Sequence, residues 1–404
     1  MKNFPWSGVA AGFVTVLVGI TSSAVIVLQA ASAAGATPTQ ISSWMLALGL
    51  GMGLTTIGLS LRYRAPVVTA WSTPGAALLV TSLSGVPMSD AIGAFVFAGA
   101  LVTLCGVTGW FERAMGKIPL SIAAAMLAAM LAGILAHFGM NVFVAMEPQF
   151  VMVFAMFVFY LLCKRWLPRY AIIIVLLIGT ALAAVEGLLH FEKFHFAWAL
   201  PVFTMPSFSW STTIGVGIPL FVVTMASQNA PGVAVIRASG YSTPVSPLMT
   251  WTGLTTVVLA PFGCFSLNLA AITAAICMGK EAHEDPAKRY WAAVAAGGFY
   301  LLVGVFGATV GAMFAAFPQE LVLAIAGLAL FGTIANSLTI AMANDKQREA
   351  ALITFLVTAS GVTLFGVGAA FWGLVAGALA YFVLSWRQAP VADAGSQALP
   401  LRQN

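Results

Sequence analysis

The fold is decided by the stretch Ala65-Pro66-Val67-Val68-Thr69-Ala70-Trp71-Ser72-Thr73-Pro74-Gly75-Ala76-Ala77, an apolar segment interrupted by two prolines. Its first half is rich in residues that favour extended backbone. Thr73-Pro74 is then typical of a helix start, with Thr as the N-cap and Pro at the first helical position. A second segment shows the same change, passing through Ser266 and Asn268 into an Ala-rich helix: Ala260-Pro261-Phe262-Gly263-Cys264-Phe265-Ser266-Leu267-Asn268-Leu269-Ala270-Ala271. Each segment therefore predicts a short strand followed by a half-helix.

Length arithmetic places the two breaks inside a membrane. Six extended residues reach roughly 20 Å, ten helical residues reach roughly 15 Å, and the hydrocarbon core is about 30 Å thick. Extended backbone at that depth survives only when it is buried in protein or lines a cavity. If the two extended pieces meet, both half-helices direct their N–H groups at one point, which suits an anion. Two ordinary proline-kinked helices are the alternative.

The composition of the chain is that of an integral membrane protein. Of 404 residues, 17 are Lys or Arg and 12 are Asp or Glu, so 7% are charged and 61% are hydrophobic. A soluble chain carries about 25% charged residues, and a disordered chain has few apolar ones. The long unbroken apolar runs exclude a porin-type barrel and a cleavable signal peptide. The basic residues occur singly or in short groups between apolar runs, which excludes a nucleic-acid-binding stripe.

Gaps between charges give the number of crossings. No charge lies between Lys2 and Arg62, between Arg237 and Lys280, or between Glu349 and Arg387, and each gap holds two helices. We predict an all-α polytopic membrane protein with fourteen transmembrane segments. These are expected near Trp6–Ala30, Ile41–Leu61, Pro66–Leu83, Ala91–Phe111, Leu120–Phe138, Phe150–Leu162, Tyr170–Leu189, Trp210–Ala230, Leu248–Ala260, Phe262–Cys277, Tyr290–Phe314, Leu321–Met342, Ala351–Phe365 and Ala369–Trp386.

The positions of the basic residues predict the orientation. With the N-terminus in the cytoplasm, every Lys and Arg except Lys193 falls on the cytoplasmic side, and the C-terminus returns there. The longest outer connection, from about His190 to Ser209, divides the chain into seven plus seven segments. An odd number in each half makes an inverted repeat, which is typical of secondary transporters. We expect residues 1–195 and 205–388 to form the two repeats and residues 389–404 a cytoplasmic tail.

Polar residues within the predicted spans mark a candidate substrate site. The eighth segment holds Ser227, Gln228 and Asn229 in succession, which is costly in a bilayer unless these side chains are paired or functional. Contact between helices is the alternative reading. With the two interrupted segments, they give the predicted substrate-binding set of Thr69, Trp71, Ser72, Thr73, Gly75, Ser227, Gln228, Asn229, Phe265, Ser266 and Asn268.

Titratable candidates are few. Glu186 and His190, spaced i,i+4 at the outer end of the seventh segment, are candidates for a proton relay, with a solvated interfacial pair as the alternative. No carboxylate falls at a predicted midplane. The four cysteines show neither CxxC spacing nor a His partner, so we expect no metal and no cofactor. His-Glu-x-x-His and Gly-x-Ser-x-Gly motifs are absent from the sequence, which argues against an enzyme.

Four stretches carry a family resemblance: Trp6-Ser7-Gly8-Val9-Ala10-Ala11-Gly12-Phe13, Ala70–Ala77, Ser227-Gln228-Asn229-Ala230-Pro231-Gly232 and Glu284–Trp291. With them the chain resembles the benzoate membrane transporter family, benzoate/proton symporters of Gram-negative inner membranes. That family is distantly similar to nucleobase carriers and to bicarbonate and sulfate carriers. The resemblance implies the seven-plus-seven inverted repeat, with segments 1–4 and 8–11 forming a core domain and segments 5–7 and 12–14 a gate domain.

The chain departs from uracil-type carriers, which place carboxylates on the eighth and tenth segments. Here those places hold Ser227-Gln228-Asn229 and Ser266-Leu267-Asn268. A carboxylate would repel an anion, so the amides favour an anionic substrate.

We therefore predict a secondary active transporter of the bacterial inner membrane that imports a small aromatic carboxylate, benzoate, with a proton. The ring would lie against Trp71 and Phe265. The carboxylate would meet the half-helix N-termini around Thr73 and Asn268, with Gln228 and Asn229 donating hydrogen bonds. A nucleobase or inorganic anion carrier of the same fold and a passive anion channel stay open, as does a homodimer.

Overall fold

The computed structural model describes residues 6–111, 113, 121–167, 171–190, 196–280, 282–362, 364 and 369–385. Within these ranges the regular secondary structure is helical apart from one two-stranded sheet and an isolated bridge residue, and irregular segments such as 196–209 connect the elements. Several charges used for the orientation lie outside the described residues, as does the predicted tail 389–404; they are Lys2, Lys117, Arg169, Lys193, Arg387 and Arg402.

The first half of the chain contains seven helices and one strand within the described residues. They are α1 (Trp6–Ala33), α2 (Pro38–Tyr63), β1 (Thr69–Trp71), α3 (Thr73–Ser82), α4 (Met88–Thr108), α6 (Ser121–Val144), α7 (Phe150–Trp166) and α8 (Ala171–Val185). α1 bends by 43° between Ser7–Ile20 and Ser23–Ala33.

The second half begins with a continuous helical run that contains two wide π-helical turns. The elements are α9 (Trp210–Thr212), η2 (Thr213–Gly217), α10 (Ile218–Thr224), η3 (Met225–Asn229), α11 (Ala230–Ala238), α12 (Val245–Leu259), η4 (Ala260–Phe262), β2 (Leu267–Leu269), α13 (Ile272–Met278), η5 (Pro286–Lys288), α14 (Tyr290–Val305), α15 (Gly307–Ala315), α16 (Gln319–Met342), α17 (Arg348–Ala359) and α18 (Ala369–Ser385).

Several of the predicted segment boundaries are wrong. The helix of the fifth segment continues past Phe138 to Val144, and that of the thirteenth ends at Ala359 rather than Phe365. The eighth segment continues past Ala230 to Ala238, because Pro231 lies in the first turn of α11, where a missing N–H costs little. The eleventh segment is broken, since α14 ends at Val305 and α15 starts at Gly307. Glycines flank this break at Gly304 and Gly307, and glycine weakens a helix interior.

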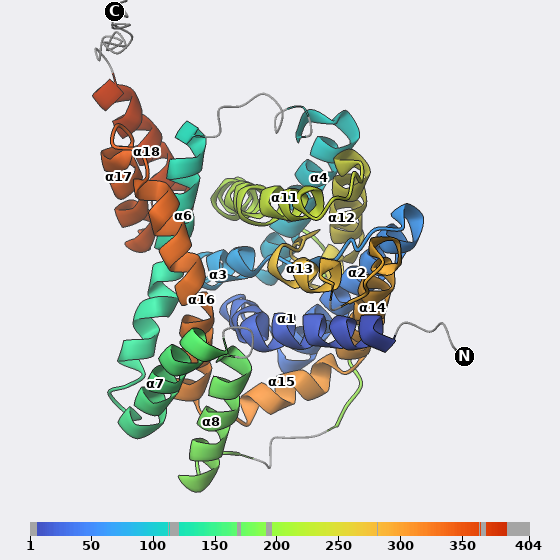
Figure 1. Ribbon diagram of the computed structural model, residues 1–404. Coiled ribbons are helices and arrows are strands. Elements are labelled where there is room, and N and C mark those ends of the chain that lie inside the picture. The colour runs from blue at the N-terminus through green and yellow to red at the C-terminus, as the bar shows by residue number, and fades with distance from the viewer. Residues whose placement is uncertain are drawn as a thin grey trace, which may run out of the picture.

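The helices form two groups that lie side by side in Figure 1. α2, α3, α4 and α12–α14 pack with α1 and with the α9–α11 run on the right of the view, while α6, α7, α8, α16, α17 and α18 pack together on the left. Contacts of α1 with α8 and α16, and of α3 with α6, connect the groups. Any space between the groups is therefore lined by residues from both.

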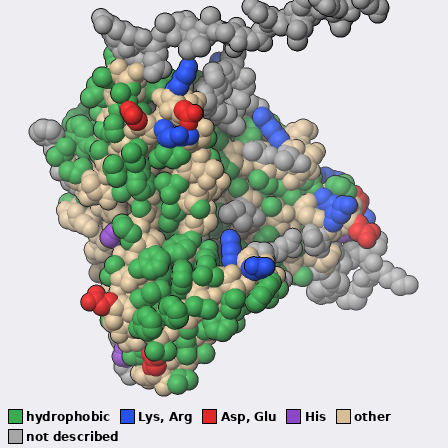
Figure 2. Space-filling model, turned by 60° about the vertical axis from the view of Figure 1, so that its left-hand side comes forward, with side chains coloured by type: hydrophobic (Ala, Val, Ile, Leu, Met, Phe, Trp, Pro, Cys, Tyr) green, Lys and Arg blue, Asp and Glu red, His purple; other side chains and the backbone are tan. Residues whose placement is uncertain are grey.

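The described helices have the length and composition of membrane spans. Five are long and apolar enough to cross a bilayer, or six if the bent α1 is counted as one span. Figure 2 shows a surface covered largely by hydrophobic side chains, with Lys and Arg in its upper, central and right-hand parts. The fold is thus a mostly helical, polytopic membrane type. The division into fourteen segments stays a prediction.

Close backbone contact joins α2 to α14. A Cβ atom added at Gly49 would lie 2.4 Å from Gly304 Cα, and one added at Gly53 would lie 2.8 Å from the Gly297 carbonyl oxygen. Small residues let helices approach closely where the hydrophobic effect cannot drive them together. This packing fixes α2 against α14 within the right-hand helix group, which also contains β1 and β2.

The two interrupted segments meet in an antiparallel pair of strands. Thr69 lies opposite Leu269, Ala70 opposite Asn268, and Trp71 opposite Leu267. Each strand thereby provides hydrogen-bond partners for backbone N–H and C=O groups of the other strand. These groups lie in the interior of the protein, where water is not there to pair with them. A strand plus a helix therefore follows in both segments, β1 with α3 and β2 with α13.

Candidate functional site

The start of α3 is fixed by Ser72 rather than Thr73. Ser72 is extended, and its hydroxyl accepts a hydrogen bond from the Gly75 N–H at 3.1 Å, which makes it the N-cap. The prediction that Thr73 caps this helix is therefore wrong by one residue. Thr224 donates to Ser72 Oγ at 3.1 Å, so the hydroxyl of the cap is bound within the protein.

Asn229 joins the eighth segment to β2. Its Oδ1 accepts from the Leu269 N–H at 2.9 Å, and its Nδ2 donates to Met225 Sδ at 3.2 Å. The wide turn η3 contributes this geometry, since π-turns inside helices change the direction of side chains. Asn229 is fully buried, so its amide is a structural link between helix and strand.

Asn268 lies within β2 and not at the start of a half-helix, because α13 begins only at Ile272. In the amide orientation that satisfies both ends of its side chain, Oδ1 accepts from the Ser72 N–H at 3.0 Å and Nδ2 donates to the Leu269 carbonyl at 3.1 Å. The predicted position of Asn268 at a helix N-terminus is therefore wrong, and its polar atoms connect the two interrupted segments.

A cavity of about 620 Å³ opens beside β1 and the start of α3. Residues of both helix groups line it. The right-hand group contributes Trp71, Thr73, Ser227 and Gln228, and the left-hand group contributes apolar residues of α6, α8 and α16 together with Tyr160, Lys164 and Asn336. The lining contains no Asp, Glu or His among the described residues.

The structure brings only part of the predicted set to this cavity. Trp71, Thr73, Ser227 and Gln228 line it, whereas the other predicted residues do not, namely Thr69, Ser72, Gly75, Asn229, Phe265, Ser266 and Asn268. Five of these seven have polar side chains, and all five are held by hydrogen bonds to other parts of the protein. Among the described residues, by contrast, the side chains of Thr73 and Gln228 form no hydrogen bond.

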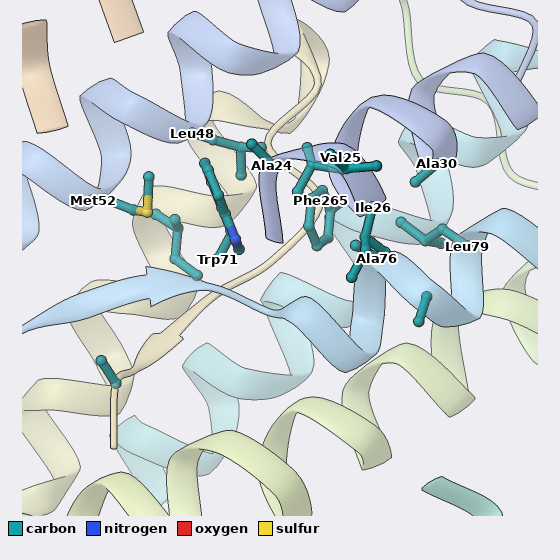
Figure 3. Packing of buried hydrophobic residues seen from close by; sticks show 14 of the residues in the cluster. Ala24, Val25, Ile26, Ala30, Leu48, Met52, Trp71, Ala76, Leu79 and Phe265 are labelled. Atoms are coloured by element: carbon teal, nitrogen blue, oxygen red, sulfur yellow. The ribbon is translucent and has the colours of Figure 1, made fainter. Parts of the chain in front are cut away.

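Trp71 and Phe265 have different surroundings. Trp71 is 4% exposed, and its Nε1–H donates to Ser23 Oγ at 2.8 Å. In Figure 3 the indole lies beside Leu48 and Met52, with part of it left to line the cavity. Phe265 is fully buried, and its ring centroid lies 6.2 Å from those of Trp44 and Phe95. Phe265 is thus placed in the packed core and away from the cavity.

Glu186 and His190 do not lie on the cavity. α8 ends at Val185, and Gly187, two residues later, adopts φ +69°, so the i,i+4 spacing does not fall on a helix. Both residues are exposed, and the His190 N–H donates to the Ala316 carbonyl at 3.0 Å. As a proton relay for this cavity the pair stays a prediction without a geometric connection to it.

Several residues that line the cavity are not in the predicted substrate-binding set. Ser23, Thr273 and Tyr300 come from helices of the right-hand group, and Lys164 and Asn336 come from α7 and α16. Tyr300 stands alone in an apolar run, where it is indistinguishable from an ordinary core aromatic. Lys164 follows an apolar run directly, so its sequence position is equally typical of a loop charge at a membrane surface.

Replacing Asn229 with Ala is expected to destabilise the protein by about 1–3 kcal/mol, the cost of leaving a buried N–H without a partner. The unsatisfied group would be the N–H of Leu269, which is fully buried. Thermal unfolding in detergent measures the change. Thr339→Ala is the control, because Thr339 is exposed and bonds only to its own helix. Equal melting temperatures for the two variants would contradict the assigned role of Asn229.

Comparison with known proteins gives the family. The model of the benzoate membrane transport protein family matches residues 2–383. The inner membrane protein YdcO of Escherichia coli is 51% identical over 383 residues, covering 95% of this chain and 97% of that protein. The benzoate membrane transport protein of Acinetobacter baylyi is 42% identical over 383 residues, covering 95% of this chain and 96% of that protein.

Two solved structures share the fold at low sequence identity. The structure of SLC26A9 matches with a TM-score of 0.62 and 12% identity, covering 93% of this chain and 65% of that chain. The transmembrane domain of the cyanobacterial bicarbonate transporter BicA matches with a TM-score of 0.58 and 10% identity, covering 92% of this chain and 97% of that chain. The family model and these two relatives match over almost the whole length and lead to one conclusion: this chain belongs to the benzoate membrane transport protein family, a family of membrane transporters.

Proposed function

We propose that this protein is a secondary active transporter that imports benzoate, or a closely similar aromatic carboxylate, together with a proton. The observation that carries the proposal is the cavity between the two helix groups, where Thr73 and Gln228 present hydrogen-bonding groups that no described residue uses. A carboxylate needs such donors once it leaves water. The relative from Acinetobacter baylyi, named as a benzoate membrane transport protein, supports the choice of substrate.

The size and lining of the cavity suit a small aromatic acid. Ligand sites are typically about 300–1,000 Å³ and mostly apolar with a few polar groups, and this cavity measures about 620 Å³. We propose that the aromatic ring lies against the edge of Trp71 and the aliphatic side chains Leu328 and Leu330. The carboxylate would then accept hydrogen bonds from Thr73 and Gln228, close to the N-terminus of α3 and its positive dipole end.

Transport would follow from movement between the helix groups. We propose that the right-hand group is the core domain, carrying the substrate site, and that the left-hand group is the gate domain. Residues 1–195 and 205–388 would be the two inverted repeats, with both termini in the cytoplasm. Alternating access then exposes one site to each side of the membrane in turn. A dimer of such chains stays an open part of this proposal.

Proton coupling is proposed without a dedicated carboxylate in the cavity. Benzoate plus one proton crosses the membrane without net charge, so uptake would respond to the pH gradient and only weakly to the membrane potential. Proteoliposomes with labelled benzoate test this directly. Accumulation is expected when the outside is acidic and is expected to disappear when an ionophore collapses the pH gradient. Failure to accumulate benzoate under the imposed gradient would refute the symporter.

The same proteoliposomes separate the alternatives. Counterflow, in which unlabelled benzoate inside drives entry of labelled benzoate, is expected for a carrier and does not occur in a passive channel. Competition by uracil or by sulfate, rather than by aromatic acids, would instead assign the site to a nucleobase or to an inorganic anion.

A further inference from the structure

Lys164 belongs to the wall of the cavity, although its sequence position is that of a surface charge. It lies in the last turn of α7, and its side chain lines the same cavity as Thr73 and Gln228. On the facing helix α16, a Cβ atom added at Gly332 would lie 3.7 Å from Lys164 Nζ. The ammonium group of Lys164 therefore lies close to the backbone of α16 at Gly332, beside the cavity.

The charge of Lys164 has no partner within the described part of the chain. No hydrogen bond or ion pair holds its ammonium group there, and no carboxylate appears among the residues that line the cavity. Tyr160, one turn earlier on α7, and Asn336, one turn after Gly332 on α16, extend the same polar strip across an otherwise apolar wall. Lys164 is itself exposed, so its charge stands at an accessible part of the cavity wall, where it attracts anions toward the cavity.

We propose that Lys164 is a substrate-binding and charge-selecting residue, the group on the gate side that attracts the carboxylate and discriminates against neutral analogues. The proposal rests on the function proposed above and names a residue of its site. Thr73 and Gln228 would bind the carboxylate from the right-hand helix group, and Lys164 would face it from the left-hand group. A bound anion would thereby contact both helix groups. Its binding would therefore depend on the position of one helix group relative to the other.

The neighbouring residue supplies a matched control. Arg165 is exposed, as Lys164 is, and carries the same charge at the same end of α7, but it does not line the cavity. Lys164→Gln and Arg165→Gln therefore remove equal charge from the same helix end, and a general loss of surface charge would affect both variants alike. Lys164→Arg keeps the charge with a larger head group and is expected to rescue most of the binding.

The test measures binding of benzoate and of its neutral isostere benzamide to the protein in nanodiscs, together with benzoate uptake. Lys164→Gln is expected to weaken benzoate binding and raise the KM by about tenfold or more. This is the size of the attraction between one positive charge and a carboxylate several ångströms away at an intermediate dielectric constant. Benzamide binding and the behaviour of Arg165→Gln are expected to stay within twofold of the wild type. Equal effects in the two Gln variants, or an unchanged benzoate affinity in Lys164→Gln, would overturn the assignment.

A wrong substrate assignment can be distinguished from a wrong role for Lys164. If the wild type does not take up benzoate, the substrate assignment is wrong, and thermal stability in sulfate, bicarbonate and chloride then decides the role of Lys164. Stabilisation by an anion that is lost in Lys164→Gln and kept in Arg165→Gln supports an anion-binding lysine. Stabilisation that is absent in the wild type, or kept in Lys164→Gln, refutes it.

Discussion

Replacing Gln228 with Glu is expected to abolish benzoate uptake at neutral pH while leaving the protein folded. The two side chains have nearly the same shape, so the half-buried position on the cavity wall can accept either. The change removes a donor and adds a negative charge where the substrate carboxylate is proposed to bind. Two unit charges about 4 Å apart repel by about 4 kcal/mol at an effective dielectric constant of about 20, which weakens binding about a thousandfold.

The measurement is initial uptake of labelled benzoate at increasing concentration, with a melting curve for each variant. Gln319→Glu is the matched control, because Gln319 is exposed at the start of α16, where a negative charge is favourable. Gln228→Met separates the lost donor from the added charge and is expected to show a smaller defect than Gln228→Glu. Wild-type uptake by Gln228→Glu would refute both the substrate charge and the site.

Replacing Gly263 with Ala is expected to cost several kcal/mol and to prevent normal folding. Gly263 adopts φ +100°, where side chains are strained, and a Cβ atom added there would lie 1.9 Å from Trp44 Cδ1. Trp44 cannot yield easily, because it is 2% exposed and its ring packs edge-on against Phe95 at 5.4 Å. Overpacking of a core costs about 1–3 kcal/mol, and the left-handed backbone adds about 1–2 kcal/mol.

Expression level and thermal unfolding in detergent report this effect. Gly298→Ala is the control, because the added Cβ meets nothing within 4 Å and the backbone of α14 is helical there. That variant is expected to be as stable as the wild type or more so, since Ala is a better helix former than Gly. A Gly263→Ala protein that melts at the wild-type temperature would show that the turn before β2 is not fixed by Trp44.

Some features were predictable because they depend on short stretches of chain. The prolines and polar residues of the two interrupted segments predicted a strand and a helix in each, and the structure has β1 with α3 and β2 with α13. The error at the start of α3 arose because a contact with a residue distant in the sequence takes part in setting that helix start. Ser72 rather than Thr73 caps α3, and the geometry of that cap includes a hydrogen bond from Thr224. Thr224 lies 152 residues away in the sequence.

The sequence by itself determined that this is a membrane protein, because the cost of placing charge in a bilayer acts on every residue and shows directly in composition and spacing. It also indicated the region of the site, since polar residues in apolar spans are rare. Only the tertiary structure decided which polar side chains are free to bind a ligand. Asn229 and Gln228 are adjacent, yet one bonds to β2 and the other faces the cavity. That difference depends on contacts across the fold, because a hydrogen-bonding group already used within the protein has little left to offer a substrate.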